Sequence, residues 1–127
     1  MSVAAKSPIG SDQSAGGTRQ RLLLTALRLY AQEGLHAVSL RRISAAAGSK
    51  NSAAMHYHFS NKLGVIEALL EMIAKEVNES AKTIRQRSTG RPSLKSSFRD
   101  TLRPLAELPL TQPWGADAIR FMSRIMT

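Results

Sequence analysis

The stretch VSLRRISAAAGSKNSAAMHYHFSNK, residues 38–62, decides the fold of this chain. It opens with Ser39, a favourable N-cap residue, and its apolar spacing predicts a short helix that runs to about Ala47. Gly48 is expected to end that helix, because glycine enters the left-handed region of backbone space without a steric penalty.

A second short helix is predicted after Asn51, and it ends near Phe59. Met55 and Phe59 are four residues apart and face inward, as do Leu40 and Ile43 of the helix before it. Two short helices joined by a tight turn form a helix-turn-helix, which can place its second helix in the major groove of DNA. On periodicity alone the signal is weak, since many three-helix units bind no DNA.

Upstream of this unit, residues 19–33 predict a supporting helix in which Leu23, Leu27 and Tyr30 share one face. Gly34 follows as its C-terminal glycine. Residues 1–17 are rich in Ser, Ala and Gly, and they predict a disordered arm.

Downstream, every predicted element is again helical, so the fold class is all-α. Residues 62–87 predict a long connector helix, and residues 94–108 predict another that Pro104 should kink or divide. Residues 88–93 and 109–115 are expected to be loops. A last helix starts near Ala116, and its apolar side chains would form a face with little to cover it: Ile119, Met122, Ile125 and Met126.

Charge and composition limit the kinds of partner and site that the chain can have. The 127 residues carry a net charge of +9 and no cysteine, which excludes disulfides, thiolate metal sites and a cysteine nucleophile, and favours the cytoplasm. Residues 1–62 hold eight basic and two acidic residues, a net charge of +6, so the half that faces a polyanion is expected to be the N-terminal half.

Two other classes of function fit the sequence less well. A basic amphipathic module on an anionic membrane or an acidic protein needs cations beside one apolar stripe, whereas residues 62–87 are mixed in charge. No apolar run is long enough to span a membrane. An enzyme is not favoured either, because no paired carboxylates, metal triad, phosphate-binding glycine loop or nucleophile elbow can be found.

The motifs in their order resemble the DNA-binding domain of the TetR family of bacterial transcriptional regulators. The resemblance covers about 50 residues and rests on the Leu-rich first helix with Tyr30-Ala31-x-x-Gly34, Val38-Ser39-Leu40-Arg41-x-Ile43-Ser44-x-Ala46-Ala47-Gly48, Tyr57-His58-Phe59, and Asn61-Lys62 with Ile66-x-x-Leu69. It implies a helix-turn-helix domain over residues 18–62. It also implies a connector helix and an incomplete ligand-binding and dimerisation domain over residues 63–127.

The same resemblance implies a ligand-responsive repressor that binds double-stranded DNA at a palindromic operator as a homodimer, with a small-molecule effector and no cofactor or metal. No ligand-binding residue is assigned. The positions that it assigns to DNA contact are Ser39, Arg41, Lys50, Asn51, Ser52, Ala53, Ala54, His56, Tyr57, His58 and Lys62. The chemistry agrees, since Asn pairs with adenine, an alanine methyl packs on the thymine methyl, and Lys or Arg pairs with phosphate.

Several alternatives stay open at this stage. Arg41 and Arg42 are neighbours that point about 100° apart on a helix, so one of them is expected to face DNA. Tyr57 is either a surface contact or a partly buried core residue. His56 and His58 diverge on a helix and lack an obvious third ligand, so a metal site is not expected. Ser49 is polar where the family often has an aliphatic residue, and the segment from Gly48 to Phe59 is one residue longer than usual. The residues assigned to base contacts could therefore be shifted by one position.

Overall fold

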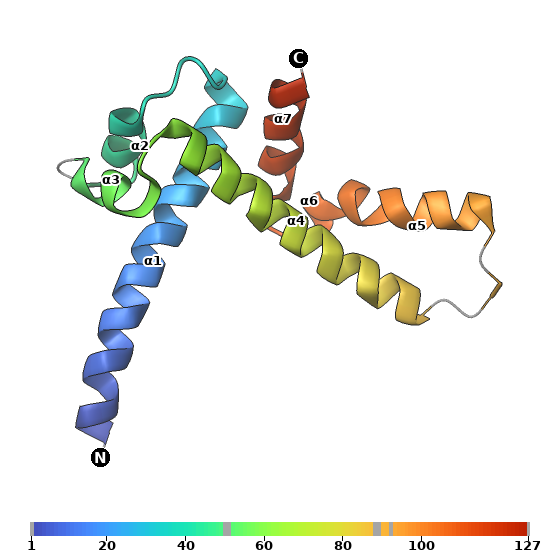
Figure 1. Ribbon diagram of the computed structural model, residues 1–127, viewed down its shortest axis with the longest axis horizontal. Coiled ribbons are helices and arrows are strands. Elements are labelled where there is room, and N and C mark those ends of the chain that lie inside the picture. The colour runs from blue at the N-terminus through green and yellow to red at the C-terminus, as the bar shows by residue number, and fades with distance from the viewer. Residues whose placement is uncertain (1, 50–51, 88–89, 92, 127) are drawn as a thin grey trace.

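The computed structural model describes residues 2–49, 52–87, 90–91 and 93–126, and within them every regular element is a helix (Figure 1). The helices are α1 (Ser2–Glu33), α2 (Leu40–Ala46), α3 (Ala53–Phe59), α4 (Lys62–Arg87), α5 (Leu94–Ala106), α6 (Leu108–Thr111) and α7 (Gly115–Met126). The prediction of an all-α fold is therefore confirmed. None of the described helices is both long and apolar enough to cross a membrane.

The C-terminal half of α1, together with α2, α3 and the start of α4, encloses the first part of the core. Among its buried apolar side chains are Leu22, Ala26, Leu29, Val65 and Leu69, together with six that the sequence predicts on inward faces: Leu23, Leu27, Tyr30, Ile43, Met55 and Phe59. Leu40, also predicted to face inward, packs against this core but is only partly buried. The predicted pattern of core residues is thus largely correct.

Two glycines set the chain turns that shape this unit. Gly34 follows α1 with φ of 92°, and Gly48 follows α2 with φ of 86°, both in the left-handed region. Residues with a Cβ rarely adopt this conformation, so the predicted helix ends at these two glycines are confirmed.

The N-terminal segment differs from the prediction. Residues 2–17, expected to be a disordered arm, continue α1 as helix. Extending an existing helix avoids the cost of nucleating a new one, and Ala4, Ala5 and Ala15 favour helix. Figure 1 shows this part of α1 projecting away from the other helices.

In the second half of the chain, α5 lies beside the later turns of α4. The start of α4 contacts the N-terminal unit, as Figure 1 shows. The loop predicted at residues 109–115 is partly wrong, because α6 occupies Leu108–Thr111. Pro109 lies in the first turn of α6, where the missing N–H costs no hydrogen bond. Pro104 lies within α5, which ends two residues later at Ala106.

Helix α7 packs against α1 and joins the two halves of the molecule. The rings of Tyr30 and Phe121 are both buried and stack with their centroids 6.0 Å apart. Arg124 Nε and Nη2 donate to the carbonyl oxygens of Ala31 and Gln32, at 3.4 Å and 3.3 Å. These carbonyls belong to the last turn of α1, whose acceptors have no partner within the helix.

The outer face of α7 is apolar and open, as predicted. Ile119, Ile125 and Met126 are exposed, and Met122 is partly buried. Phe121, on the side of the helix that faces α1, is fully buried and stacks on Tyr30. The helix thus has one side in the core and one apolar side at the surface.

Candidate nucleic-acid interface

The first residues of α2 are held by a capping hydrogen bond. The Ser39 backbone is extended, and its Oγ accepts from the backbone N–H of Arg42 at 3.0 Å. This satisfies one of the donors that the first turn of a helix leaves without a partner. The predicted N-cap is confirmed, and the side chain proposed to approach DNA also fixes the start of α2.

The two neighbouring arginines of α2 have different surroundings. Arg42 Nη2 donates to Glu33 Oε2 at 2.6 Å, and this ion pair ties α2 to the end of α1. Arg41 is exposed and makes no hydrogen bond or ion pair with any residue the structure describes. Arg41 is therefore the arginine of this pair that is available to an anion.

Helix α3 is anchored through one side and open on the other. Met55 and Phe59 are buried in the core, whereas His56 and Tyr57 are exposed, and Tyr57 keeps 83% of its surface. The alternative of a partly buried Tyr57 is wrong. Its ring lies edge-on to the half-buried ring of His58, with centroids 4.9 Å apart and an interplanar angle of 81°.

The start of the predicted recognition helix is only partly described. Lys50 and Asn51 lie outside the described residues. Ser52 precedes α3 and makes no capping hydrogen bond through its side chain. Ala53 is exposed and Ala54 is half-buried against the core, so of these two alanines Ala53 has the more accessible methyl group.

The turn between α3 and α4 is tight and well defined. Ser60 adopts φ of 52°, and Asn61 Oδ1 accepts from the backbone N–H of Gly64 at 2.8 Å, as expected for a residue that caps α4. A Cβ on Gly64 would overlap the carbonyl oxygen of Phe59. This close approach places Lys62, half-buried in the first turn of α4, directly after the end of α3.

Arg19 is a residue that the sequence interpretation did not assign to the site. Its guanidinium lies over the ring of Phe59, with Cζ 5.2 Å from the centroid. The side chain thereby brings a cation from α1 to the α3–α4 turn, in a shallow recess that it shares with His58 and Asn61. A basic residue at the start of a predicted helix gives no sign of this contact, which depends on tertiary packing.

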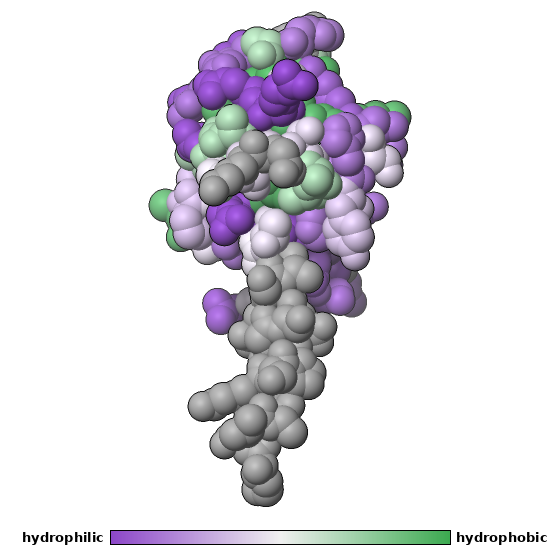
Figure 2. Space-filling model, turned by 90° about the vertical axis from the view of Figure 1, so that its left-hand side faces the viewer, coloured by the Kyte–Doolittle hydropathy of each residue, from purple (hydrophilic) through white to green (hydrophobic). Residues whose placement is uncertain are grey.

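The surface formed by α2 and α3 is mostly hydrophilic, as Figure 2 shows from that side of the molecule. In the described part of the chain, no cluster of three or more His, Asp or Glu residues is arranged to hold a metal ion. The arrangement offers hydrogen-bonding side chains and cations on two short helices, which suits recognition of a polyanion rather than coordination chemistry.

An exposed second helix, packed on a first helix through a glycine turn and supported by α1, defines a helix-turn-helix domain. Residues 22–69 match the family described as bacterial regulatory proteins, tetR family. Over these residues the chain therefore matches the helix-turn-helix domain of TetR-family regulators.

One curated relative makes the comparison more specific. The chain is 31% identical over 100 residues to a protein named HTH-type transcriptional regulator AcrR from Shigella flexneri. The aligned region covers 79% of this chain and 45% of that protein, so the chain spans less than half the length of the relative. No solved structure matches the chain significantly.

Proposed function

We propose that the chain is the DNA-binding part of a ligand-responsive repressor that binds a palindromic operator as a symmetric dimer. Residues 18–62 would bind DNA, and residues 63–127 would form the connector helix and part of the ligand-binding and dimerisation domain. The observation that carries the proposal is the anchoring of α3 through Met55 and Phe59, which leaves His56 and Tyr57 exposed. A helix held in this way can enter a major groove without rearranging its own core.

The roles of the individual residues follow from their surroundings. Arg41, Lys62 and His58 are proposed to contact phosphates, and His56 and Tyr57 to reach base edges or phosphates. Asn51, Ser52, Ala53 and Ala54, together with Lys50, are proposed to read bases at the start of the recognition helix. Ser39 is proposed to approach the backbone while it caps α2.

The capping bond of Ser39 has a further consequence for phosphate binding. Its Oγ accepts from the N–H of Arg42, and this bond holds the first turn of α2 in place. A phosphate near this turn would meet the positive end of a helix with Arg41 beside it. A bacterial operator lies in the cytoplasm, where the chain is proposed to act without enzymatic activity and without a cofactor.

The test is selection of bound sequences from random DNA duplexes, followed by sedimentation of the complex to count protomers. We expect an inverted repeat whose half-sites are about one helical turn, or a multiple of it, apart. Two protomers are expected on each site. Binding without sequence preference would refute the specific regulator, and a single direct half-site would refute the palindromic dimer.

A matched pair of variants connects the selection to the structure. Tyr57→Ala removes an exposed side chain of α3, whereas Leu110→Ala removes an exposed apolar side chain of α6, far along the chain from α3. Weaker binding to the selected site by Tyr57→Ala alone would support the proposal. Equal binding by both variants would place the DNA contact elsewhere.

A further inference from the structure

A groove of about 410 Å³ lies between the later turns of α4 and the helix α5. It is far along α4 from the helix-turn-helix, as Figure 1 shows. Three arginines line it, Arg87 from α4 and Arg99 and Arg103 from α5. We refer to it as the arginine groove.

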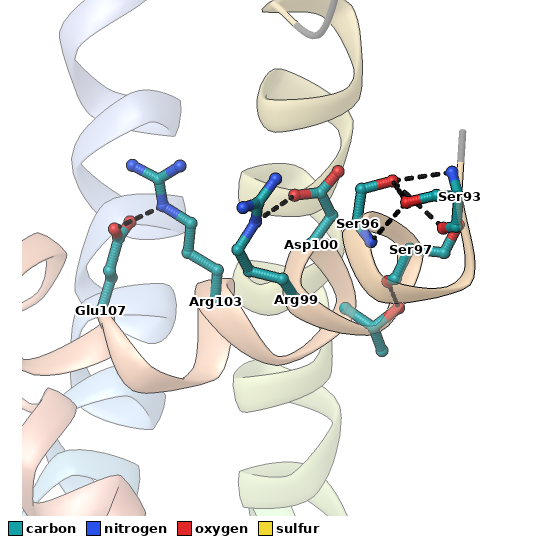
Figure 3. A network of polar contacts seen from close by, with 8 residues as sticks. Ser93, Ser96, Ser97, Arg99, Asp100, Arg103 and Glu107 are labelled. Carbon is teal, nitrogen blue, oxygen red and sulfur yellow. Dashed lines mark hydrogen bonds and ion pairs between the residues drawn. The ribbon is translucent and has the colours of Figure 1, made fainter. Parts of the chain in front are cut away.

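Of the two arginines of α5, Arg103 is hydrogen-bonded to the carboxylate of Glu107, and Arg99 lies near the carboxylate of Asp100 without a hydrogen bond to it. Arg103 Nε donates to Glu107 Oε1 at 2.7 Å, and Arg99 Nε lies 3.8 Å from Asp100 Oδ1. Figure 3 shows both side chains rising from α5, with Nε of Arg103 joined to the carboxylate of Glu107. In each pair the arginine approaches the carboxylate through Nε.

The terminal amino groups of these arginines have no hydrogen-bond partner among the described residues. Arg87 likewise makes no ion pair with any of them. A guanidinium fixed through Nε still presents a planar pair of amino groups, and such a pair matches two oxygens of a phosphate or carboxylate. Glu107 thus positions Arg103 without occupying its terminal donors.

The charge balance and a serine hydroxyl group also favour an anion. Three guanidinium groups face two carboxylates in the groove, so its lining carries a net charge of +1. Ser80 of α4 adds a hydroxyl group to the lining, whereas Thr83 already donates its proton to the carbonyl oxygen of Glu79 at 3.2 Å and is not counted as a donor to an anion. The acid side chains would repel an anion at their own positions, which restricts it to the side of the terminal amino groups.

We propose that the arginine groove is a binding site for a small molecule that carries a phosphate or a carboxylate group. Arg99 and Arg103 supply the paired donors, and Arg87 supplies a third cation from the opposite helix. Because the ligand would contact both α4 and α5, binding also holds these two helices together. The site does not depend on the DNA-binding role proposed above.

The experiment titrates the 127-residue chain, without DNA, with inorganic phosphate in one series and succinate in another. Binding is followed by backbone amide chemical shifts at constant ionic strength maintained with chloride. We expect saturable shifts at residues of α4 and α5 that line the groove. A preference for one of the two anions identifies which oxyanion the site takes.

Three variants locate the site. Arg103→Gln is expected to weaken binding by about tenfold or more, since a charged hydrogen bond is lost. Arg103→Lys keeps the charge without the planar pair of donors and is expected to restore only part of the affinity. Arg85→Gln, which removes an exposed arginine of α4 outside the groove, serves as the control and should bind as the unaltered chain does.

The helical circular dichroism of each variant is compared with that of the unaltered chain, so that a folding defect is recognised. If Arg103→Gln does not fold, Arg87→Gln tests the same groove from α4. Shifts that grow linearly without saturation, or equal affinity of the groove variants and Arg85→Gln, would overturn the proposal. Either result would leave the DNA-binding proposal intact, because no DNA is present.

Discussion

Arg42 Nη2 lies 2.6 Å from Glu33 Oε2, and this ion pair connects α2, the first helix of the helix-turn-helix, to the end of α1. It also separates the roles of two adjacent arginines. Arg42 forms an ion pair with Glu33, whereas Arg41 is exposed and forms no hydrogen bond or ion pair with any described residue.

The first prediction compares these arginines. Arg41→Ala should weaken DNA binding at low salt without changing thermal stability, because only a phosphate contact is removed. Arg42→Ala should lower the free energy of unfolding by about 0–1 kcal/mol, as expected for an ion pair that is partly exposed. Fluorescence anisotropy and thermal unfolding measure the two effects. The reverse pattern would assign the phosphate contact to Arg42.

The second prediction concerns Lys62. Lys62→Ala should weaken binding to all DNA sequences alike and reduce the slope of log K against log salt concentration by about 1. Lys82→Ala, in a later turn of α4, is the control, because Lys82 is 3.8 Å from Glu79 and remote from the helix-turn-helix. An unchanged slope for Lys62→Ala would remove this residue from the interface.

The third prediction concerns the pH dependence of stability. Burial raises the pKa of the Tyr30 hydroxyl from 10.0 to about 12. The unfolded chain therefore releases this proton at lower pH than the folded chain, so the contribution to stability is complete below pH 10 and is lost as pH rises towards 12. Tyr30→Phe should remove this part of the loss, measured as melting temperature against pH.

The exposed Tyr57 supplies the matched control for that measurement. Tyr57→Phe should keep the decrease in melting temperature above pH 10 that depends on Tyr30. Near neutral pH, Tyr30→Phe should cost little stability, because the buried hydroxyl has no hydrogen-bond partner among the residues that the structure describes. An identical pH profile for Tyr30→Phe and the unaltered chain would contradict the prediction.

The fourth prediction concerns the turn before α4. Gly64→Ala should lower the free energy of unfolding by about 1–3 kcal/mol, since the new methyl group overlaps the carbonyl oxygen of Phe59. Gly90→Ala adds the same methyl group where no atom lies within 4 Å. Chemical denaturation should therefore separate the two variants. Equal stability would show that the α3–α4 turn moves apart at little cost.

Local signals in the sequence were sufficient for most of the helix-turn-helix. The capping role of Ser39 and the turns at Gly34 and Gly48 depend on backbone chemistry within a few residues, so they can be predicted. The burial of Met55 and Phe59 follows from their spacing of four. These features place α2 and α3 and determine which side of α3 is exposed.

Contacts between distant segments could not be predicted in the same way. Nothing near Arg19 indicates that its side chain lies over Phe59, forty residues later in the chain. Likewise, the sequence predicts that one of two arginines faces DNA, but only the position of Glu33 shows which one is occupied. The arginine groove depends on how α5 lies against α4, and helical periodicity contains no information about that geometry.

The two halves of the molecule are connected in two ways, through the long helix α4 and through the hydrogen bonds from Arg124 to the last turn of α1. One is α4, whose 26 residues form a lever arm of about 39 Å, so that a slight bend displaces its far end considerably. The other is the last turn of α1. There the carbonyl oxygens of Ala31 and Gln32 accept hydrogen bonds from Arg124, and the next residue, Glu33, forms the ion pair with Arg42. The last turn of α1 is thus bonded to both α7 and α2, so a displacement of α7 relative to α1 would act next to the residue that holds α2.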